Sequence, residues 1–203
     1  MHMKRQSVAK TWTIPRKGTK YVVVPSHEKK NGIPLTVIIR DILEIAKTKK
    51  EVKSILAQGA VSVNEKIRKE ENFSVLPFDI IKIGDKSYEL VFSEKGKLQL
   101  KETKRKEMIL KVIGKKILPE KKVQLNLLYG KNIITDKKVN VGDSIILENK
   151  KITKIFTMEK GREVIVFAGK YKGKEGKIEK IDKNIATLSC KNEKINVPVG
   201  SIM

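Results

Sequence analysis

Apolar residues between positions 34 and 46 recur three and four residues apart, which is the spacing of one helix face. The stripe consists of Leu35, Ile38, Ile39, Ile42, Ile45 and Ala46. Pro34 suits the first helical position, because an N–H group there would have no partner within the helix. The pattern therefore predicts a helix that starts at Pro34 and buries this stripe.

A second short helix is predicted after Thr48. The Thr48 side chain can accept a hydrogen bond from the backbone N–H of Glu51, whose carboxylate can reach back in turn, as in a capping box. The apolar face of this helix consists of Val52, Ile55 and Leu56. Gly59 supplies a left-handed residue that ends the helix. We expect the two helices to pack as a pair.

Beyond Gly59 the apolar residues alternate, as they do in β-strands. Val61, Val63 and Ile67 surround the dipeptide Asn64-Glu65, which predicts a tight hairpin that closes over the helices. Residues 73–83 are expected to supply another strand. Residues 34–84 are thus predicted to form one small helix–helix–hairpin module.

The rest of the chain has the pattern of short strands. The apolar runs in residues 85–158 cover 88–92, 98–100, 108–113, 123–128, 132–134 and 144–147. Short strands at this spacing, separated by glycines, predict a small antiparallel barrel or sandwich. Residues 159–203 contain a strand from Val164, a glycine-rich loop and a returning strand, which predicts a last β domain.

In residues 1–33 the apolar positions follow neither the helical nor the strand spacing. Pro15 and Pro25 interrupt regular structure, so we expect an extended basic arm that docks on the next domain through Trp12 and residues 21–24. The rings of Trp12 and Tyr21 could stack on a base or pack against the protein, and their aliphatic neighbours favour packing. The predicted fold class is α+β, with this arm, the helical module and two β-barrel-like domains in succession.

Charge narrows the list of partners. The 203 residues include 45 Lys and Arg against 23 Asp and Glu, which gives a formal net charge of +22. Such an excess repels itself unless a polyanion neutralises it, so nucleic acid is the leading partner. No stretch approaches the roughly 20 apolar residues of a membrane span. No signal-peptide run precedes residue 15, so a cytoplasmic location is expected.

The sequence contains few of the residues that usually carry out catalysis or bind metals. The only histidines are His2 and His27, so a serine or cysteine nucleophile has no evident base, and no histidine-rich metal cluster is present. The single cysteine, Cys190, cannot form an internal disulfide and lies in an alternating run, where a small buried hydrophobe is favoured over a reactive thiol. We therefore predict that the protein is not an enzyme and takes no cofactor, metal or small-molecule substrate.

The two motifs resemble known RNA-binding modules. Residues 48–68, followed by Phe78-Asp79-Ile80-Ile81, resemble the alpha-L or S4 module of ribosomal proteins, pseudouridine synthases and tyrosyl-tRNA synthetases. That resemblance implies an RNA face on the second helix and hairpin, although Asn64-Glu65 stands where many members have Asn-Gly. Residues 164–182 resemble the KOW motif of ribosomal proteins and transcription elongation factors. A nucleotide-binding P-loop is disfavoured, because its G-x-x-x-x-G-K-[ST] spacing is missing.

The order of basic arm, alpha-L module, barrel and KOW barrel resembles the archaeal and eukaryotic small-subunit ribosomal protein S4e family, in an archaeal form. The resemblance implies a structural protein of the small ribosomal subunit that binds rRNA and neighbouring ribosomal proteins. The alternative is a free RNA-binding or transcription-elongation accessory factor. One departure is residues 26–32, Ser-His-Glu-Lys-Lys-Asn-Gly, where the family usually has Pro-Gly-Pro-His.

The candidate RNA-binding residues follow from charge, from the glycine loop and from the resemblance. They are Lys4, Arg5, Lys10, Arg16, Lys17, Lys47, Lys49, Lys50, Lys53, Lys66, Arg68, Lys104, Arg105, Lys106, Lys170, Lys172, Lys174 and Lys177. Gly169, Gly173 and Gly176 are the predicted structural glycines of the KOW loop. A solvated strand face around residues 101–122 and a solubilising turn at the KOW loop remain the alternatives for those lysines.

Charge is unevenly distributed along the chain. Residues 51–100 carry eight basic and eight acidic side chains, whereas residues 1–30 carry eight basic residues and one acid. We therefore expect the alpha-L stretch to orient the protein and the flanking segments to contribute most of the electrostatic attraction. Removal of the arm should weaken binding more than neutralisation of Lys49 and Lys50.

Overall fold

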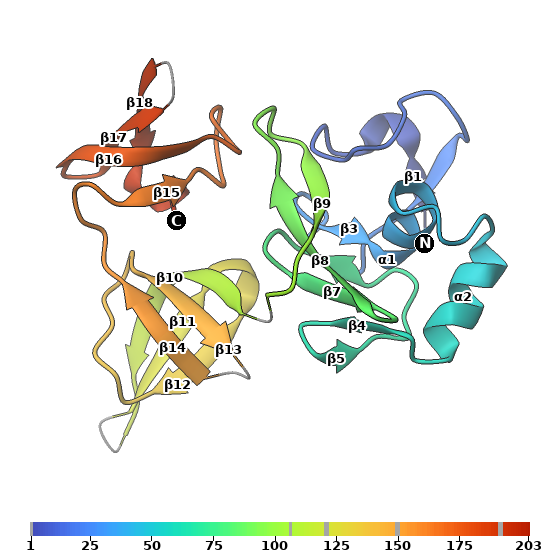
Figure 1. Cartoon of the computed structure of the whole chain (residues 1–203), viewed down its shortest axis with the longest axis horizontal. Helices are drawn as coiled ribbons and strands as arrows, with labels where there is room; N and C mark the ends of the chain where they lie inside the picture. The colour runs from blue at the N-terminus through green and yellow to red at the C-terminus, as the bar shows by residue number, and fades with distance from the viewer. Residues whose placement is uncertain (1, 106, 120–121, 149–150, 191–192) are drawn as a thin grey trace. The chain divides into compact units, whose positions relative to one another are not determined.

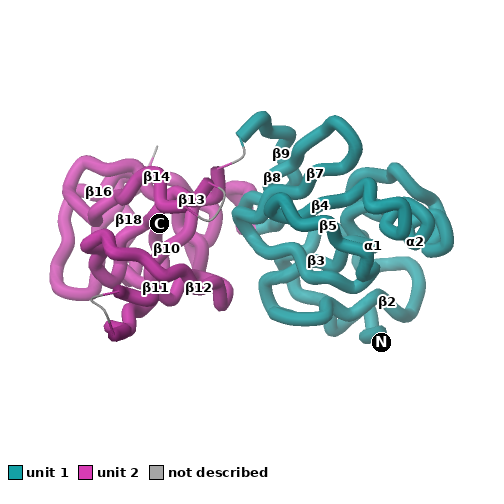
Figure 2. The backbone as a smooth tube through the Cα atoms, turned by 90° about the horizontal axis from the view of Figure 1, so that it is seen from below, with its two compact units in different colours: residues 1–92, 97–106 teal, residues 93–96, 107–203 magenta. Residues whose placement is uncertain are grey.

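The computed structural model describes all residues except 1, 106, 120–121, 149–150 and 191–192. The described residues are mostly β-structure with few helices. They form two compact units (Figure 2): residues 1–92 with 97–106, and residues 93–96 with 107–203. Among the described residues, the α-helices lie in the first unit, and each unit is built around its own antiparallel sheets.

The N-terminal segment of the first unit is folded, so the expectation of an extended arm is wrong for this structure. Strand β1 (His2–Lys4) pairs antiparallel with β2 (Tyr21–Val23), and a 3-10 turn, η1 (Arg5–Ser7), follows β1. The backbone N–H of Leu98 donates to the carbonyl of Thr11 at 2.7 Å. Trp12 is 3% exposed and packs against the protein as predicted, whereas Tyr21 is 47% exposed.

The first predicted helix is shorter than its apolar stripe. The structure has one turn, α1 (Leu35–Val37), followed by a π-helical turn, η2 (Ile38–Ile42). Pro34 lies in β3 (Ile33–Pro34), which pairs with β6 (Ser74–Val75), and so precedes the helix instead of starting it. Glu44 has a φ of 54°, a left-handed conformation that no helix continues through.

The apolar stripe predicted too long a helix, because most of this segment is buried on every side. Residues 33–39 are all buried, so their spacing does not mark one amphipathic face. The run is also rich in β-branched residues, which are weak helix formers. Beyond the turn, Ala46 is buried but Ile45 is 47% exposed.

The second helix, α2 (Lys49–Ala57), forms as predicted (Figure 1). The Glu51 N–H donates to the Thr48 hydroxyl at 3.3 Å, and the Glu51 carboxylate accepts the Thr48 hydroxyl and the N–H of Lys47, both at 2.8 Å. The bonds from Lys47 and Thr48 lower the pKa of Glu51. Val52 and Leu56 are fully buried, and Gly59 ends the helical segment with a φ of 73°.

The main sheet of the first unit has the strand order β5-β4-β7-β8-β9. Its strands are β4 (Val61–Val63), β5 (Lys66–Ile67), β7 (Ile80–Ile83), β8 (Lys86–Phe92) and β9 (Leu98–Glu102). The β4–β5 hairpin turns at Asn64 and Glu65, whose φ values of 49° and 66° fit a two-residue turn. Strands β8 and β9 belong to this sheet, so the boundary between the units lies beyond residue 84.

The strand predicted over residues 73–83 is interrupted. A turn separates β6 from β7, and the nearly buried Asp79 closes it by accepting the Leu76 N–H at 2.9 Å. Asp79 also accepts the Asn64 side-chain amide at 2.8 Å, and Asn64 accepts the Ile80 N–H at 3.0 Å. One buried carboxylate thus fixes both this turn and the β4–β5 hairpin.

The second unit begins with a five-stranded sheet of order β12-β11-β10-β13-β14. Its strands are β10 (Met108–Ile117), β11 (Val123–Leu127), β12 (Asn132–Thr135), β13 (Ser144–Glu148) and β14 (Lys151–Phe156), with the 3-10 turn η3 (Leu128–Gly130) after β11. Alternate residues such as Leu110, Leu125 and Ile145 are fully buried and form its core. These strands match the apolar runs predicted from residue 108 onward.

The last sheet has the order β15-β16-β17-β18. Its strands are β15 (Glu163–Ile165), β16 (Glu175–Asp182), β17 (Ile185–Cys190) and β18 (Glu193–Pro198), followed by η4 (Val199–Ser201). Val166 pairs with Ile202 beyond η4, and Met203 exchanges two backbone hydrogen bonds with Ile165. Cys190 packs half-buried against this core, and burial raises the pKa of its thiol, in agreement with the interpretation as a small hydrophobe.

One lysine of the second unit lies inside the protein. Lys111, in β10, is 3% exposed, and its ammonium group donates to the carbonyl oxygens of Val199 and, at 2.8 Å, Ile202. Burial lowers the pKa of Lys111 to about 8. A side chain from the first sheet of this unit therefore holds the backbone that follows the last sheet.

Candidate nucleic-acid interface

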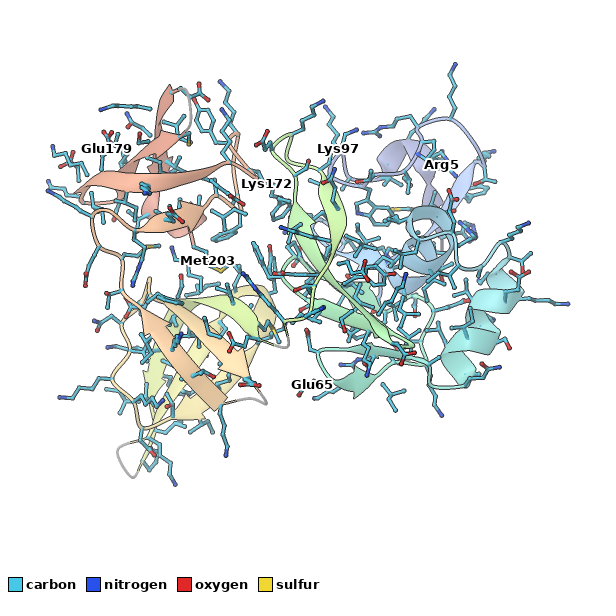
Figure 3. The ribbon with its side chains drawn as sticks, in the orientation of Figure 1. Arg5, Glu65, Lys97, Lys172, Glu179 and Met203 are labelled. Carbon is cyan, nitrogen blue, oxygen red and sulfur yellow. The ribbon has the colours of Figure 1, made fainter. Side chains whose placement is uncertain are left out.

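Among the predicted basic residues of the N-terminal segment, one is hydrogen-bonded within the protein and the others are exposed. Arg5 (labelled in Figure 3) donates from Nε to the Thr19 carbonyl at 2.7 Å, and from its two terminal nitrogens to the Pro15 carbonyl and the Thr19 hydroxyl, each at 2.8 Å. Arg5 thus holds residues 15–19 in place. The other four predicted residues of this segment are exposed: Lys4, Lys10, Arg16 and Lys17.

The lysines of α2 face a carboxylate that sequence reasoning did not connect to them. The Lys49 ammonium lies 2.9 Å from one Glu71 oxygen, and the Lys53 ammonium lies 3.9 Å from the other. The second distance is an ion pair but too long for a hydrogen bond. Glu71 precedes β6, so only the tertiary fold brings it to α2. Lys47 and Lys50 are exposed.

The β4–β5 hairpin brings Lys66 and Arg68 to the same module. Lys66 is exposed, while the Arg68 guanidinium lies 4.2 Å from the centre of the Phe73 ring. His27 meets the same ring edge-on at a centroid distance of 5.0 Å. Glu65, labelled in Figure 3, sits at the hairpin turn and is exposed, so the hairpin presents one acidic side chain beside its basic ones. The stacking of Arg68 on Phe73 was not predicted.

The basic run after β9 is only partly described. Lys104 and Arg105 are exposed, and Lys106 lies outside the described residues. Burial raises the pKa of Glu89 in β8, and the positive charges of Arg105 and Lys101 oppose that rise. Arg105 therefore has a carboxylate of its own unit nearby.

The glycines of the KOW loop have two different roles. Gly169 and Gly173 have φ values of 86° and 89°, which favour glycine. Gly176 has no such conformation, but a Cβ atom there would lie 2.8 Å from the Ser189 carbonyl oxygen and 2.9 Å from the Cys190 sulfur. Two glycines therefore permit the loop to bend, and the third permits β16 to approach β17.

Tyr171 is the centre of the KOW loop. The ammonium groups of Lys170 and Lys174 lie 5.6 and 5.2 Å from the centre of its ring, within the range of a cation–π contact. Lys174 also forms an ion pair with Glu193, and the hydrogen bond to Glu193 raises the pKa of Lys174.

The other two candidate lysines of this segment, Lys172 and Lys177, are also engaged to different degrees. Lys177 lies 3.5 Å from Glu163 in a well-exposed pair. Lys172 is half-buried, and burial lowers its pKa. The four predicted lysines thus share one short segment, but they are not equivalent charges.

The described residues contain neither a metal-ligand cluster nor a membrane-spanning helix. They include no group of three or more His, Cys, Asp or Glu side chains placed to hold a metal ion. None of the helices in the described ranges is long and apolar enough to cross a membrane. Lysines displayed on a glycine loop and on short turns can neutralise the phosphates of a nucleic-acid backbone.

Comparison with known proteins identifies the class more closely. Residues 84–155 match the family described as Ribosomal family S4e, and residues 160–191 match the KOW motif. The small ribosomal subunit protein eS4 of Archaeoglobus fulgidus is 38% identical over 186 residues, covering 88% of this chain and 79% of the relative. The protein of the same name from Methanocella arvoryzae is 37% identical over 188 residues, covering 89% and 80%.

A solved structure agrees with these relatives. The crystal structure of the 30S ribosomal protein S4e from Thermoplasma acidophilum superposes with a TM-score of 0.73 at 30% identity, covering 86% of this chain and 95% of that one. The chain therefore belongs to the ribosomal S4e family. Its membership confirms the resemblance predicted from the sequence, and members of this family are structural proteins and not enzymes.

Proposed function

We propose that this protein is a structural constituent of the small ribosomal subunit, where it binds rRNA through phosphate and shape contacts and touches neighbouring ribosomal proteins. Its relatives of 38% and 37% identity bear the name small ribosomal subunit protein eS4. The observation that carries the proposal is the display of basic side chains on short, fixed turns in both units, in a chain of net charge +22. Lysines held this way neutralise phosphates without reading bases.

The finer organisation is part of the same proposal. Residues 34–84 would act as an alpha-L RNA-binding module, 85–158 as a central β domain and 159–203 as a KOW-containing barrel, with 1–33 as a basic N-terminal element. The matches to residues 84–155 and 160–191 support the two C-terminal parts of this division, whereas the structure places strands β8 and β9 in the main sheet of the first unit. The proposed contact residues remain the candidate RNA-binding residues predicted from the sequence, from Lys4 to Lys177.

Sedimentation tests the proposed location. Cells of the native organism that carry a tagged copy are lysed at moderate salt, and the lysate is fractionated on a sucrose gradient. The tagged chain should run with the small subunit. A chain that stays in the light fractions while small subunits run without it would instead favour a free RNA-binding or elongation accessory factor.

A further inference from the structure

Tyr21 differs in its exposure from the other large aromatic residues of the protein. It is 47% exposed, whereas every other Phe, Tyr and Trp within the described ranges is buried or half-buried. A tyrosine ring combines a large apolar face with a polar tip, and such rings are enriched where proteins contact their partners. The ring of Tyr21 is therefore a candidate contact surface.

A short β-ribbon holds this ring at a fixed position. In the pairing of β1 with β2, Lys4 lies opposite Tyr21 and His2 lies opposite Val23. Because alternate residues of paired strands share one face, His2, Lys4 and Tyr21 lie on the same face of the ribbon, and all three are exposed. Val22 belongs to the opposite face and is 4% exposed. The ribbon thus buries one face and presents the other to solvent.

Two exposed side chains contact the Tyr21 ring. His2 meets it edge-on at a centroid distance of 4.8 Å, and the Lys20 ammonium lies 5.5 Å from the ring centre. An exposed cation–π contact is weaker than the stacking of a nucleobase on an aromatic ring. A base can therefore displace the Lys20 ammonium, which is then free to approach a phosphate.

The charge around the ring selects a polyanion as its partner. Lys4 and Lys20 flank Tyr21, and no aspartate or glutamate occurs in the chain before Glu28. Proteins bind single-stranded nucleic acid with this combination, in which cations follow the backbone and aromatic rings stack on the bases. A base inside a duplex is covered by its neighbours on both faces, so the ring requires an unpaired base.

We propose that the exposed face of the β1–β2 ribbon binds one unpaired nucleotide of RNA, with its base stacked on Tyr21 and the adjoining phosphates neutralised by Lys4 and Lys20. The inference deepens the proposed rRNA-binding function and rests on it. It names the RNA feature that this segment binds, an unstacked base in a loop, bulge or single strand. The sequence leaves stacking and packing open for both Trp12 and Tyr21, whereas the structure buries Trp12 and exposes Tyr21.

NMR of the tyrosine rings in the full chain reports stacking directly. The chain has four tyrosines, and the signal that Tyr21→Phe removes is that of Tyr21. Synthetic oligoadenylate is the probe, and linear polyphosphate is the matched polyanion without bases. The ring current of a stacked adenine should move the Tyr21 ring protons upfield as oligoadenylate is added. Polyphosphate should not produce this shift.

Affinity measurements separate the ring from the charge. Tyr21→Leu keeps an apolar side chain in the strand but removes the ring, so oligoadenylate should bind about tenfold more weakly. Tyr21→Phe should stay within about twofold of the wild type, because stacking uses the ring and not the hydroxyl. Ile134→Ala is the control, since it removes an exposed apolar side chain of the second unit, and it should change the affinity by less than about twofold. Circular dichroism checks that each variant is folded.

Three results would overturn the stacking surface. The first is a Tyr21 signal that oligoadenylate does not move. The second is an equal shift with polyphosphate, which would show that charge alone acts on the ring. The third is full oligoadenylate affinity in Tyr21→Leu, or an equal loss in Tyr21→Phe. Full affinity in Tyr21→Leu would leave the exposed ring as a contact for a neighbouring protein.

Filter binding of small-subunit rRNA measures the proposed function separately. The wild type should bind tightly, and Tyr21→Leu should bind about tenfold more weakly. Tight and equal binding by both proteins would reject the stacking surface alone. Absent rRNA binding by the wild type would reject the ribosomal function, and an upfield shift with oligoadenylate in that case would still support the stacking surface.

Discussion

The N-terminal segment and helix α2 both carry cations of the first unit, but these cations are in different states. Lys10, Arg16 and Lys17 are exposed, and no acidic residue precedes Glu28. Two of the α2 lysines, Lys49 and Lys53, share the Glu71 carboxylate. A count of basic residues therefore overstates the charge that α2 presents. A carboxylate that pairs with a lysine offsets part of the charge that the lysine presents to a polyanion.

The largest expected difference comes from two matched triple substitutions. Lys10→Gln/Arg16→Gln/Lys17→Gln should lower the slope of log Kd against log salt for rRNA binding by roughly 2 to 3 units, since each phosphate contact contributes about 0.7 to 0.9. Lys49→Gln/Lys50→Gln/Lys53→Gln should lower it by only about 1 unit, because Glu71 already balances part of that charge. Filter binding over a salt series measures both.

These substitutions serve better than truncation of the segment, because residues 11 and 13 hydrogen-bond to β9 and their loss would disturb the unit itself. Circular dichroism should confirm that both triple variants keep the wild-type fold. A larger slope change for the α2 variant than for the N-terminal one would reverse the comparison.

Glu71→Gln tests the partnering directly. The change releases Lys49 and Lys53 without removing a basic residue, so rRNA should bind about threefold tighter at low salt, with a slope steeper by up to about 1 unit. Glu70→Gln is the control, because it removes the same charge from the exposed neighbouring position. Equal effects of the two variants would mean that only net charge matters, and that the Glu71 contacts do not restrain the α2 lysines.

The same logic predicts a smaller effect in the KOW loop. Glu193→Gln releases Lys174 alone, from a pair whose Glu193 side chain is half exposed. Exposed pairs are worth little, so we expect less than about a twofold gain in rRNA affinity over the control Glu175→Gln. Surface plasmon resonance at two salt concentrations resolves this difference. A loss of affinity in Glu193→Gln would show that Glu193 orients Lys174 toward the RNA instead of withholding it.

The sequence predicted the elements that local signals determine. The cap at Thr48, the hairpin turn at Asn64-Glu65 and the strands from residue 108 onward all depend on neighbours a few residues apart, and the structure has them. The family was accessible for the same reason, since its motifs are contiguous. The end of the first helix could not be predicted from the sequence, because a segment buried on all sides has no amphipathic period.

The electrostatic partners were harder to predict, because they come from distant parts of the chain. Glu71 reaches α2 through the pairing of β3 with β6, and Glu193 reaches Lys174 through the last sheet. Arg5 looked like one more basic residue of an arm, yet it binds a loop more than ten residues away. The candidate site could be predicted from the positions of basic residues in the sequence. The acidic partners of the basic residues became evident only in the tertiary structure.

Lys111 is a buried cation whose ammonium group is bound by backbone carbonyl oxygens of the protein. Its replacement should therefore have the smallest effect on RNA binding. Its pKa of about 8 lies below the value of about 10.4 in an unfolded chain. Between these values the unfolded chain binds more protons, so the contribution of Lys111 to the free energy of unfolding rises with pH from about 8 to 10.4, by at most about 1.4 kcal/mol per pH unit. Below pH 8 that contribution is constant.

Lys111→Met removes this dependence, and Lys115→Met, at an exposed position of the same strand, does not. Urea unfolding at pH 7, 8, 9 and 10 should therefore show the wild-type and Lys115→Met free energies rising relative to that of Lys111→Met above pH 8. At pH 7 all three proteins should bind rRNA equally within about twofold, because a buried ammonium that donates to two carbonyl oxygens has no phosphate to neutralise. Parallel pH profiles would show that Lys111 keeps an ordinary pKa, and weaker rRNA binding by Lys111→Met alone would show that a fully partnered lysine still contributes charge to the interface.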